Sequence, residues 1–214
     1  MPEIEHVRKA FRDWEDRGSP EKGAAAVAMV LRRGADGLEA LFIERATREG
    51  DPWSGQMAFP GGRWEETDSD LVETAQRETL EELSVDLSAS QCIGYLGDLR
   101  GMSRRTMAIS GYIFDWDGPA PDLRPNVEVA AALWLPLRAL RDPRRAVNYR
   151  VPYSPGQDFT GILVDGPHGE VDESRPGGPR VIWGLTHRFL REFHGALDLE
   201  FPVRPRRVPT VGDV

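Results

Sequence analysis

FPGGRWEETDSDLVETAQRETLEELSV, residues 59–85, is the stretch that decides the fold, because it sets two adjacent glycines ahead of a helix with clustered carboxylates. On a helix, Glu78, Glu81 and Glu82 stand at i, i+3 and i+4, so the 3.6-residue repeat brings all three onto one face. Like-charge pairs at these spacings each cost roughly 0.2 to 0.5 kcal/mol, whereas a bound Mg²⁺ turns the repulsion into coordination. The pattern predicts a divalent-metal site; ordinary solvated charge is the alternative.

A second face of the same helix predicts how it packs. An apolar stripe offset from the acids suits packing on a sheet and consists of Val72, Ala75, Thr79 and Leu83. Gly61 and Gly62 predict a turn whose bare main chain approaches a metal or phosphate closely, and Pro60 stiffens its entry. Arg77 adjoins the acids and is expected to hold one carboxylate by a charge-assisted hydrogen bond.

The spacing resembles the Nudix box, in which a glycine, a glutamate and an R-E-x-x-E-E run stand at fixed intervals. Gly62, Asp68 and the run RETLEE at 77–82 occupy those positions here. The chain departs from the box in three ways: Asp68 replaces glutamate, one extra residue precedes the run, and Ser84 replaces a glycine at the helix end. Loss of that glycine costs on the order of 1 kcal/mol of stability and leaves the acids intact.

The resemblance implies an α/β fold, the Nudix α/β/α sandwich with a mixed central sheet, with the box as loop, helix and loop at the edge of the sheet. It implies hydrolysis of a diphosphate linkage in a small nucleotide-containing molecule, with Mg²⁺ or Mn²⁺ as cofactor. By motif position, Glu78 and Glu82 are the leading metal ligands, Glu81 is a third, and the carbonyl of Gly62 is a fourth.

The resemblance also assigns roles in catalysis. Arg77 orients the glutamates, and Asp68 either holds a ligand indirectly or fixes the turn. Two acids compete as general base: Glu81 in the box, and Glu128, which resembles an acid that some family members supply from outside it. A plain surface glutamate at a strand start is the alternative for Glu128. The four histidines, which lack a metal-ligand spacing and are expected at the surface or in helix packing, are His6, His168, His187 and His194.

A subgroup is indicated by LFIERATREGDPWSGQMAFPGG at 41–62, which resembles the signature of coenzyme A pyrophosphatases, and less specifically by IWGLT at 182–186. Coenzyme A would be cleaved to 4′-phosphopantetheine and adenosine 3′,5′-bisphosphate. Gly50 stands where that signature usually has arginine, and the spacing to Gly55 is one residue longer. A broad-specificity pyrophosphatase acting on ADP-ribose, a nucleotide sugar or a nucleoside triphosphate is therefore the closer rival. A non-catalytic ligand-sensing module is the third reading.

Guanidinium groups suit bidentate phosphate binding, so four arginines are candidate substrate contacts: Arg45, Arg48, Arg104 and Arg105. Solvated surface arginine is the alternative for each. With only Lys9 and Lys22 as lysines, arginine is the ordinary basic residue of this chain and its presence is less informative.

Length and charge bound the remaining possibilities. The 214 residues suit one domain at 21–200, with an N-terminal helix at 1–20 belonging to it and a flexible tail at 201–214. A net charge of −8 argues against a nucleic-acid polymer as partner. The single Cys92 forms no internal disulfide, no leader opens the chain and no apolar run reaches the roughly 18 to 20 residues that span a bilayer, so the cytoplasm is expected and a membrane is not. A homodimer is compatible with the resemblance, since many Nudix proteins dimerise.

Hydrophobic periodicity predicts the other elements. Ile4, Val7, Phe11 and Trp14 recur at helical spacing, so an opening helix is expected to end before Ser19. The further expected elements are a hairpin at 24–31 and 38–44, strands at 92–99, 107–116, 127–135 and 159–164, and helices at 138–141 and 181–197.

Overall fold

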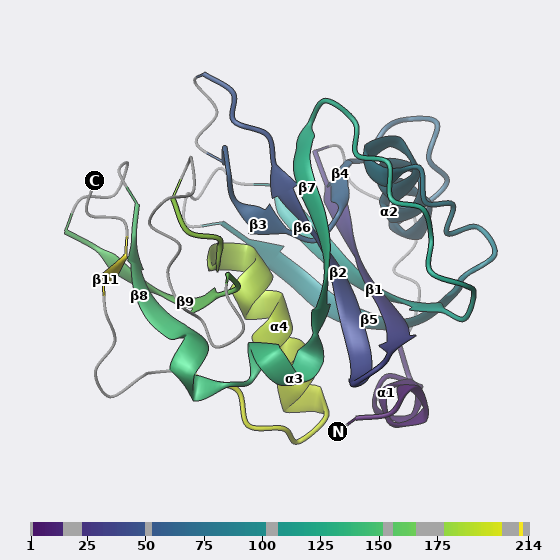
Figure 1. The fold of residues 1–214 in the computed structure, drawn as a ribbon. Coiled ribbons are helices and arrows are strands. Elements are labelled where there is room, and N and C mark those ends of the chain that lie inside the picture. Colours follow the sequence, from purple (N-terminus) through teal and green to yellow (C-terminus); the bar gives the residue numbers. More distant parts are fainter. Residues whose placement is uncertain are drawn as a thin grey trace.

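The fold is taken from a computed structural model, which describes residues 2–14, 23–49, 53–101, 107–151, 156–165, 178–202 and 210–211. The strands of its main sheet are β1 Ala25–Gly34, β2 Gly37–Arg45, β3 Met57–Ala58, β4 Gly61–Arg63, β5 Gln91–Arg100, β6 Ala108–Trp116 and β7 Val129–Pro136. Hydrogen-bonded neighbours follow the order β3-β2-β1-β6-β5, with β4 on β1 and β7 on β2 (Figure 1). Because β1 pairs β6 in parallel and β2 antiparallel, the sheet is mixed, as expected.

Alternation along β1 and β2 divides the core between the two faces of this sheet. Ala28 and Val30 join the cluster that includes Ala75 and Leu83 of α2 (Leu71–Leu83). Met29 and Leu31 join the cluster on the other face, which contains the apolar side chains of α4 (Gly184–Ala196) and α1 (Ile4–Ala10). Figure 1 shows α2 and α4 on opposite sides of the sheet. The α/β/α layering and mixed central sheet are thus confirmed.

The expected opening helix is shorter than predicted. It ends at Ala10, and Phe11 stacks on Phe193 with ring centroids 6.0 Å apart. Trp14 was expected on the same apolar stripe, but it follows the helix and packs edge-on against Tyr112, within the cluster of the α2 face. Ser19 lies outside the described residues.

A second, smaller sheet was only partly predicted. It consists of β8 Ala146–Arg150, β9 Asp158–Leu163, β10 Val181–Ile182 and β11 Thr210–Val211, in the order β10-β9-β8-β11. The strand expected at 159–164 is β9, whereas β8 was not predicted. The helix expected at 181–197 begins only at Gly184, because Val181 and Ile182 pair with β9 instead. The short helix expected at 138–141 is α3 Leu137–Leu140.

The segment predicted as a flexible tail contributes to the fold at two places. Thr210 and Val211 pair in parallel with Asn148 and Tyr149, although prolines were expected to prevent pairing there. Phe201 is buried and packs between the rings of His187 and His194, at centroid distances of 5.2 and 4.8 Å. The expectation that this segment neither pairs nor is buried is therefore wrong at these residues, while its flexibility stays a prediction. No helix in the described part of the chain has the length and apolar character required to cross a bilayer.

Candidate functional site

Gly61 and Gly62 lie in strand β4, antiparallel to β1, and not in the turn predicted from the sequence. Gly61 has φ of +149°, and a Cβ on it would lie 2.2 Å from the carbonyl oxygen of Ala26. A Cβ on Gly62 would lie 2.4 Å from Oε1 of Glu78. Glycine is therefore needed twice for different reasons: the first lets β4 reach β1, and the second leaves space for a carboxylate of the acidic helix.

Helix α2 is capped by a side chain at its N-terminus and ends in a left-handed residue. The Asp70 side chain accepts a hydrogen bond from the amide of Glu73 at 2.7 Å, which caps the N-terminus. At the other end Ser84 has φ of +57°, the left-handed conformation for which the box usually supplies glycine. Ala75, Thr79 and Leu83 of the predicted stripe are buried. Their burial orients the acids toward β4.

Glu82 is the most buried of the three acids, with 3% of its surface exposed. Its Oε2 accepts a hydrogen bond from the backbone amide of Gly61 at 2.9 Å. Burial raises the pKa of Glu82 to about 8, the Gly61 amide opposes that rise, and the negative charge of Glu78 adds to it. A buried carboxylate of this kind is costly to ionise unless a cation approaches it.

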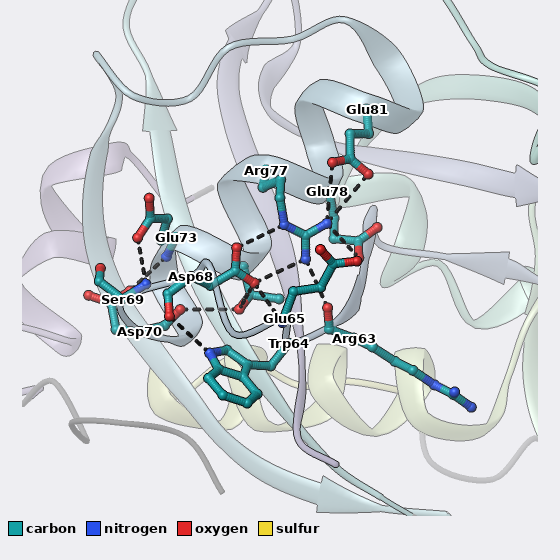
Figure 2. Close-up of polar contacts among 11 residues, drawn as sticks. Arg63, Trp64, Glu65, Asp68, Ser69, Asp70, Glu73, Arg77, Glu78 and Glu81 are labelled. Atoms are coloured by element: carbon teal, nitrogen blue, oxygen red, sulfur yellow. Dashed lines mark hydrogen bonds and ion pairs between the residues drawn. The ribbon is translucent and has the colours of Figure 1, made fainter. Parts of the chain in front are cut away.

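Arg77 organises the acids around it (Figure 2). Its Nε donates to Oδ1 of Asp68 at 2.8 Å and its Nη2 to Oδ2 at 3.0 Å, a bidentate pair. The same Nη2 donates to the carbonyl of Arg63 at 2.9 Å. Nη1 lies 3.1 Å from Oε1 of Glu78 and 3.3 Å from Oε1 of Glu81. The expectation that Arg77 holds a carboxylate in place by a charge-assisted hydrogen bond is confirmed.

Asp68 fixes the turn before α2, one of the two roles expected for it, and its indirect hold on a metal ligand stays a prediction. It is buried, and its Oδ2 accepts from the amide of Glu65 at 3.0 Å and from the hydroxyl of Thr74 at 2.9 Å. Burial acts to raise the pKa of Asp68, but the hydrogen bonds from Arg77, Glu65 and Thr74 outweigh it and lower the pKa. Asp68 therefore stays ionised, closes the turn before α2 and fixes the guanidinium that contacts the glutamates.

The three glutamates do not form a ready-made cage. Among the described residues, no group of three or more His, Cys, Asp or Glu side chains is arranged to hold a metal ion. The physical reason is that Arg77 draws Glu78 and Glu81 to itself while Glu82 binds the Gly61 amide. Their role as ligands, with the Gly62 carbonyl, stays a prediction.

The chemistry of the site nevertheless fits a hard divalent cation. The donors are all oxygens, which Mg²⁺ and Mn²⁺ prefer. Burial raises the pKa of Glu78 as well as that of Glu82, with Arg77 opposing the rise at Glu78. A cation would offset the cost of ionising both. A Cβ at Gly62 would lie 2.4 Å from Oε1 of Glu78, so glycine at this position leaves that carboxylate its place beside the strand.

Glu128 is brought to the acidic helix from a distant part of the chain. Its negative charge contributes to raising the pKa of both Glu78 and Glu82. Its side chain is 46% exposed, and Oε1 accepts from Nη2 of Arg48 at 3.0 Å. The Glu81 side chain is 55% exposed. Both candidate general bases, Glu81 inside the box and Glu128 outside it, are therefore exposed enough to contact water.

Of the four arginines expected to contact substrate, two lie within the described residues. Arg45 ends β2, and its positive charge lowers the pKa of Glu82, so it lies on the acid side of the sheet. Arg48 pairs with Glu128. Arg104 and Arg105 lie outside the described residues.

Sequence reasoning missed Asn126, which binds the end of α2. Its side-chain Nδ2 donates to the carbonyl of Glu81 at 3.0 Å, and its backbone amide donates to the carbonyl of Glu82 at 2.9 Å. The one available signal was an asparagine two residues before Glu128, a spacing typical of a side chain that accepts from the backbone two residues on. That contact exists, at 2.8 Å.

The histidines take no part in this site within the described structure. His187 and His194 are buried in the packing of α4, as expected, and His6 is exposed. His168 lies outside the described residues.

Comparison with known proteins gives the family. The model of the NUDIX domain matches residues 22–154. A mouse (Mus musculus) protein, mitochondrial coenzyme A diphosphatase NUDT8, is 32% identical over 173 residues, which cover 79% of this chain and 75% of the relative. Nudix hydrolase 22, chloroplastic, of Arabidopsis thaliana is 30% identical, with 81% of this chain and 54% of the relative covered.

A third relative, the uncharacterized protein C14C4.10c of Schizosaccharomyces pombe, is 38% identical over 111 residues, covering 48% of this chain and 33% of the relative. The chain thus spans a third of this relative and about half of the Arabidopsis protein. With the domain model matching more than half of its length, this chain belongs to the Nudix family.

Proposed function

We propose that this protein hydrolyses the diphosphate linkage of coenzyme A or a coenzyme A derivative, releasing 4′-phosphopantetheine, or its derivative, and adenosine 3′,5′-bisphosphate. The observation that carries the proposal is the placement of Glu82 and Glu78 against Gly61 and Gly62 of β4, with the charge of Glu128 acting on both, in a chain 32% identical to a relative named as a coenzyme A diphosphatase. Nudix hydrolases generally depend on divalent metals. We propose Mg²⁺ or Mn²⁺ here.

The bound cation would neutralise phosphate charge and make the attacking water more acidic. Glu78, Glu82 and Glu81, with the Gly62 carbonyl, would hold it. Arg77 keeps Glu78 and Glu81 oriented through contacts of 3.1 and 3.3 Å. Arg45 and Arg48 would contact substrate phosphates, and we assign the same role to Arg104 and Arg105 from the sequence.

Glu128 is the proposed general base, with Glu81 as the alternative. Water attacks one phosphorus, the bond from that phosphorus to the bridging oxygen breaks, and Glu128 accepts a proton from the water. Because Arg48 already pairs with Glu128, arrival of a phosphate at Arg48 would loosen that pair and leave the carboxylate available.

The test is a substrate panel with Mg²⁺ and with Mn²⁺, in which coenzyme A, an acyl-coenzyme A, ADP-ribose, a nucleotide sugar and a nucleoside triphosphate are incubated with the protein and products are identified by mass. The proposal expects the two named products from coenzyme A at the highest kcat/KM. Intact coenzyme A beside a cleaved ADP-ribose or nucleotide sugar would instead favour a broad-specificity pyrophosphatase.

That second candidate has one specific observation in its favour, because Gly50 replaces the arginine usual in the coenzyme A signature. Light scattering during size exclusion of the active fraction decides whether the acting species is a homodimer. Location in the cytoplasm stays a prediction; two of the relatives carry names that place them in mitochondria and chloroplasts.

A further inference from the structure

The C-terminal end of α2 is capped by a distant loop. The last carbonyls of a helix have no partner within it. Here Ser84 supplies its amide to the carbonyl of Leu80 at 2.8 Å, and the next three carbonyls are taken by the loop before β7. The side chain of Asn126 donates to the carbonyl of Glu81 at 3.0 Å, and the backbone amide of Asn126 donates to the carbonyl of Glu82 at 2.9 Å. The backbone amide of Arg124 donates to the carbonyl of Leu83 at 2.9 Å. The loop is therefore fastened to two of the three residues whose carboxylates belong to the box, Glu81 and Glu82.

Asn126 is the residue that joins this cap to Glu128. Its side-chain nitrogen donates to the carbonyl of Glu81, while its side-chain oxygen accepts from the amide of Glu128 at 2.8 Å. Only a carboxamide offers a donor and an acceptor in this arrangement. Aspartate keeps the acceptor, loses the donor, and places negative charge at the end of a helix that already carries partial negative charge.

Glu128 is held from two further sides. Its carbonyl accepts from the amide of Ala46 at 2.8 Å, and its carboxylate accepts from Nη2 of Arg48 at 3.0 Å. Arg48 is itself tied to Ser54, whose hydroxyl accepts from the Arg48 amide and donates to the Arg48 carbonyl, both at 2.9 Å. Asn126 thus supplies the one link between Glu128 and the acidic helix among these contacts.

We propose that Asn126 is a positioning residue, which sets the place of the Glu128 carboxylate relative to Glu81 and Glu82 by clasping the end of α2. The proposal rests on the proposed function, in which Glu128 receives the proton of the attacking water. Asn126 touches no substrate in this account. Its loss lowers kcat through Glu128 and leaves KM nearly unchanged.

A double-mutant cycle tests this coupling. The variants are Asn126→Ala, Glu128→Gln and the pair, assayed on whichever diphosphate the wild-type protein cleaves fastest. Asn126→Asp is the near-isosteric variant, which remains informative if the alanine variant folds poorly. Asn148→Ala is the matched control, because Asn148 lies in β8 of the smaller sheet. Circular dichroism and urea unfolding establish that each variant is folded.

We expect Asn126→Ala and Asn126→Asp to lower kcat by roughly 10-fold or more with KM within about threefold, as for residues that orient a catalytic group. In the Glu128→Gln background the same substitutions change kcat by less than about twofold, because two residues acting through one group are non-additive. Asn148→Ala keeps wild-type kcat and KM.

The inference is overturned if Asn126 substitution lowers kcat equally with and without Glu128→Gln, or if an Asn126 variant keeps wild-type kcat. Either result leaves the proposed function standing. A wild-type protein that cleaves no diphosphate in the panel overturns the proposed function, and the positioning role falls with it. The two failures are therefore distinguishable.

Discussion

The backbone amide of Gly61 donates to the carboxylate of Glu82 at 2.9 Å, across 21 residues of sequence. This contact joins the acidic helix to β4, and the pairing of β4 with β1 ties it to the central sheet. The donor is main chain, so its position depends on the strand and not on a side-chain rotamer. The geometry around Glu82 therefore depends on whether residue 61 can keep its backbone conformation.

Substituting each of the two glycines with alanine should separate folding from activity. Gly61→Ala combines a left-handed φ with a Cβ 2.2 Å from a backbone oxygen, so the free energy of unfolding should fall by roughly 2 to 4 kcal/mol. Gly62→Ala meets only the end of the Glu78 side chain, so stability should change by less than about 1 kcal/mol while turnover falls at least roughly tenfold. Urea unfolding and a turnover assay measure both. Equal stability losses in the two variants would contradict this account.

Removing the charge of Glu82 should abolish activity without unfolding the protein. Glu82→Gln keeps an acceptor for the Gly61 amide and replaces a buried carboxyl group that is costly to ionise, so stability without metal should be equal or higher. Turnover should fall at least about 100-fold, because a lost metal ligand costs several kcal/mol at the transition state. Thermal unfolding with and without Mg²⁺ should show a metal-dependent rise in Tm for the wild type that shrinks in the variant.

The exposed Glu66 provides the control, and Glu66→Gln should keep both turnover and the metal-dependent rise. Wild-type turnover in Glu82→Gln would remove its assigned role as a metal ligand.

The two buried histidines of α4 predict a loss of stability in mild acid. Burial lowers the pKa of both His187 and His194 to about 4, and the positive charges of Arg191 and Arg141 add to the respective shifts. Between the unfolded value near 6.5 and about 4, the unfolded chain binds more protons than the folded one, so stability falls as the pH falls. Each pH unit should cost on the order of 1 kcal/mol per histidine.

Urea unfolding at a series of pH values from 7.5 downward, in steps of about half a unit, measures this slope. The double variant His187→Asn, His194→Asn should have a shallower slope, whereas the exposed His6→Asn should match the wild type. A wild-type slope in the double variant would assign the acid sensitivity to other groups.

Arg180 should be a stabilising link between the two sheets. Its Nε donates to Oε2 of Glu44 in β2 at 2.9 Å, and its Nη1 lies 3.4 Å from Oδ1 of Asp165, which follows β9. Both carboxylates are buried, so Arg180→Met should lower the free energy of unfolding by roughly 3 kcal/mol. Arg138→Met breaks an exposed pair with Asp36 and should cost less than about 1 kcal/mol. Similar values for the two variants, measured by urea unfolding, would show that the buried pair is not the stronger one.

Much of the fold could be predicted because the relevant signals are local. The β1–β2 hairpin follows from two apolar runs flanking Gly34 and Gly37, and Gly37 takes φ of +106° at the turn. The acidic helix follows from a stripe that repeats every three to four residues. The layers and the mixed sheet were expected from the family resemblance alone, and the order of its strands was not predicted, since periodicity does not specify which strands are neighbours.

What could not be predicted depends on contacts between distant segments. The strand β10 reads as the start of a helix by periodicity, and only its pairing with β9 decides otherwise. Thr210 and Val211 are two β-branched residues among prolines, and only the edge of β8 decides that they pair. At the site, the side chain of Asn126 contacts a residue 45 positions away. An asparagine in a polar loop carries no sequence signal that distinguishes such a contact from ordinary solvation.

The attachment of the acidic helix to β4 has a consequence for evolution and engineering. Glu78, Glu81 and Glu82 lie in a helix. Arg48, Ser54 and Glu128 lie in the connections between strands. Exchanging the connection that carries Arg48 and Ser54, while keeping Glu128, would vary substrate selectivity and leave the acidic helix and the proposed general base in place. Libraries built by exchanging residues 46–55 are therefore a direct route to new selectivity in this protein.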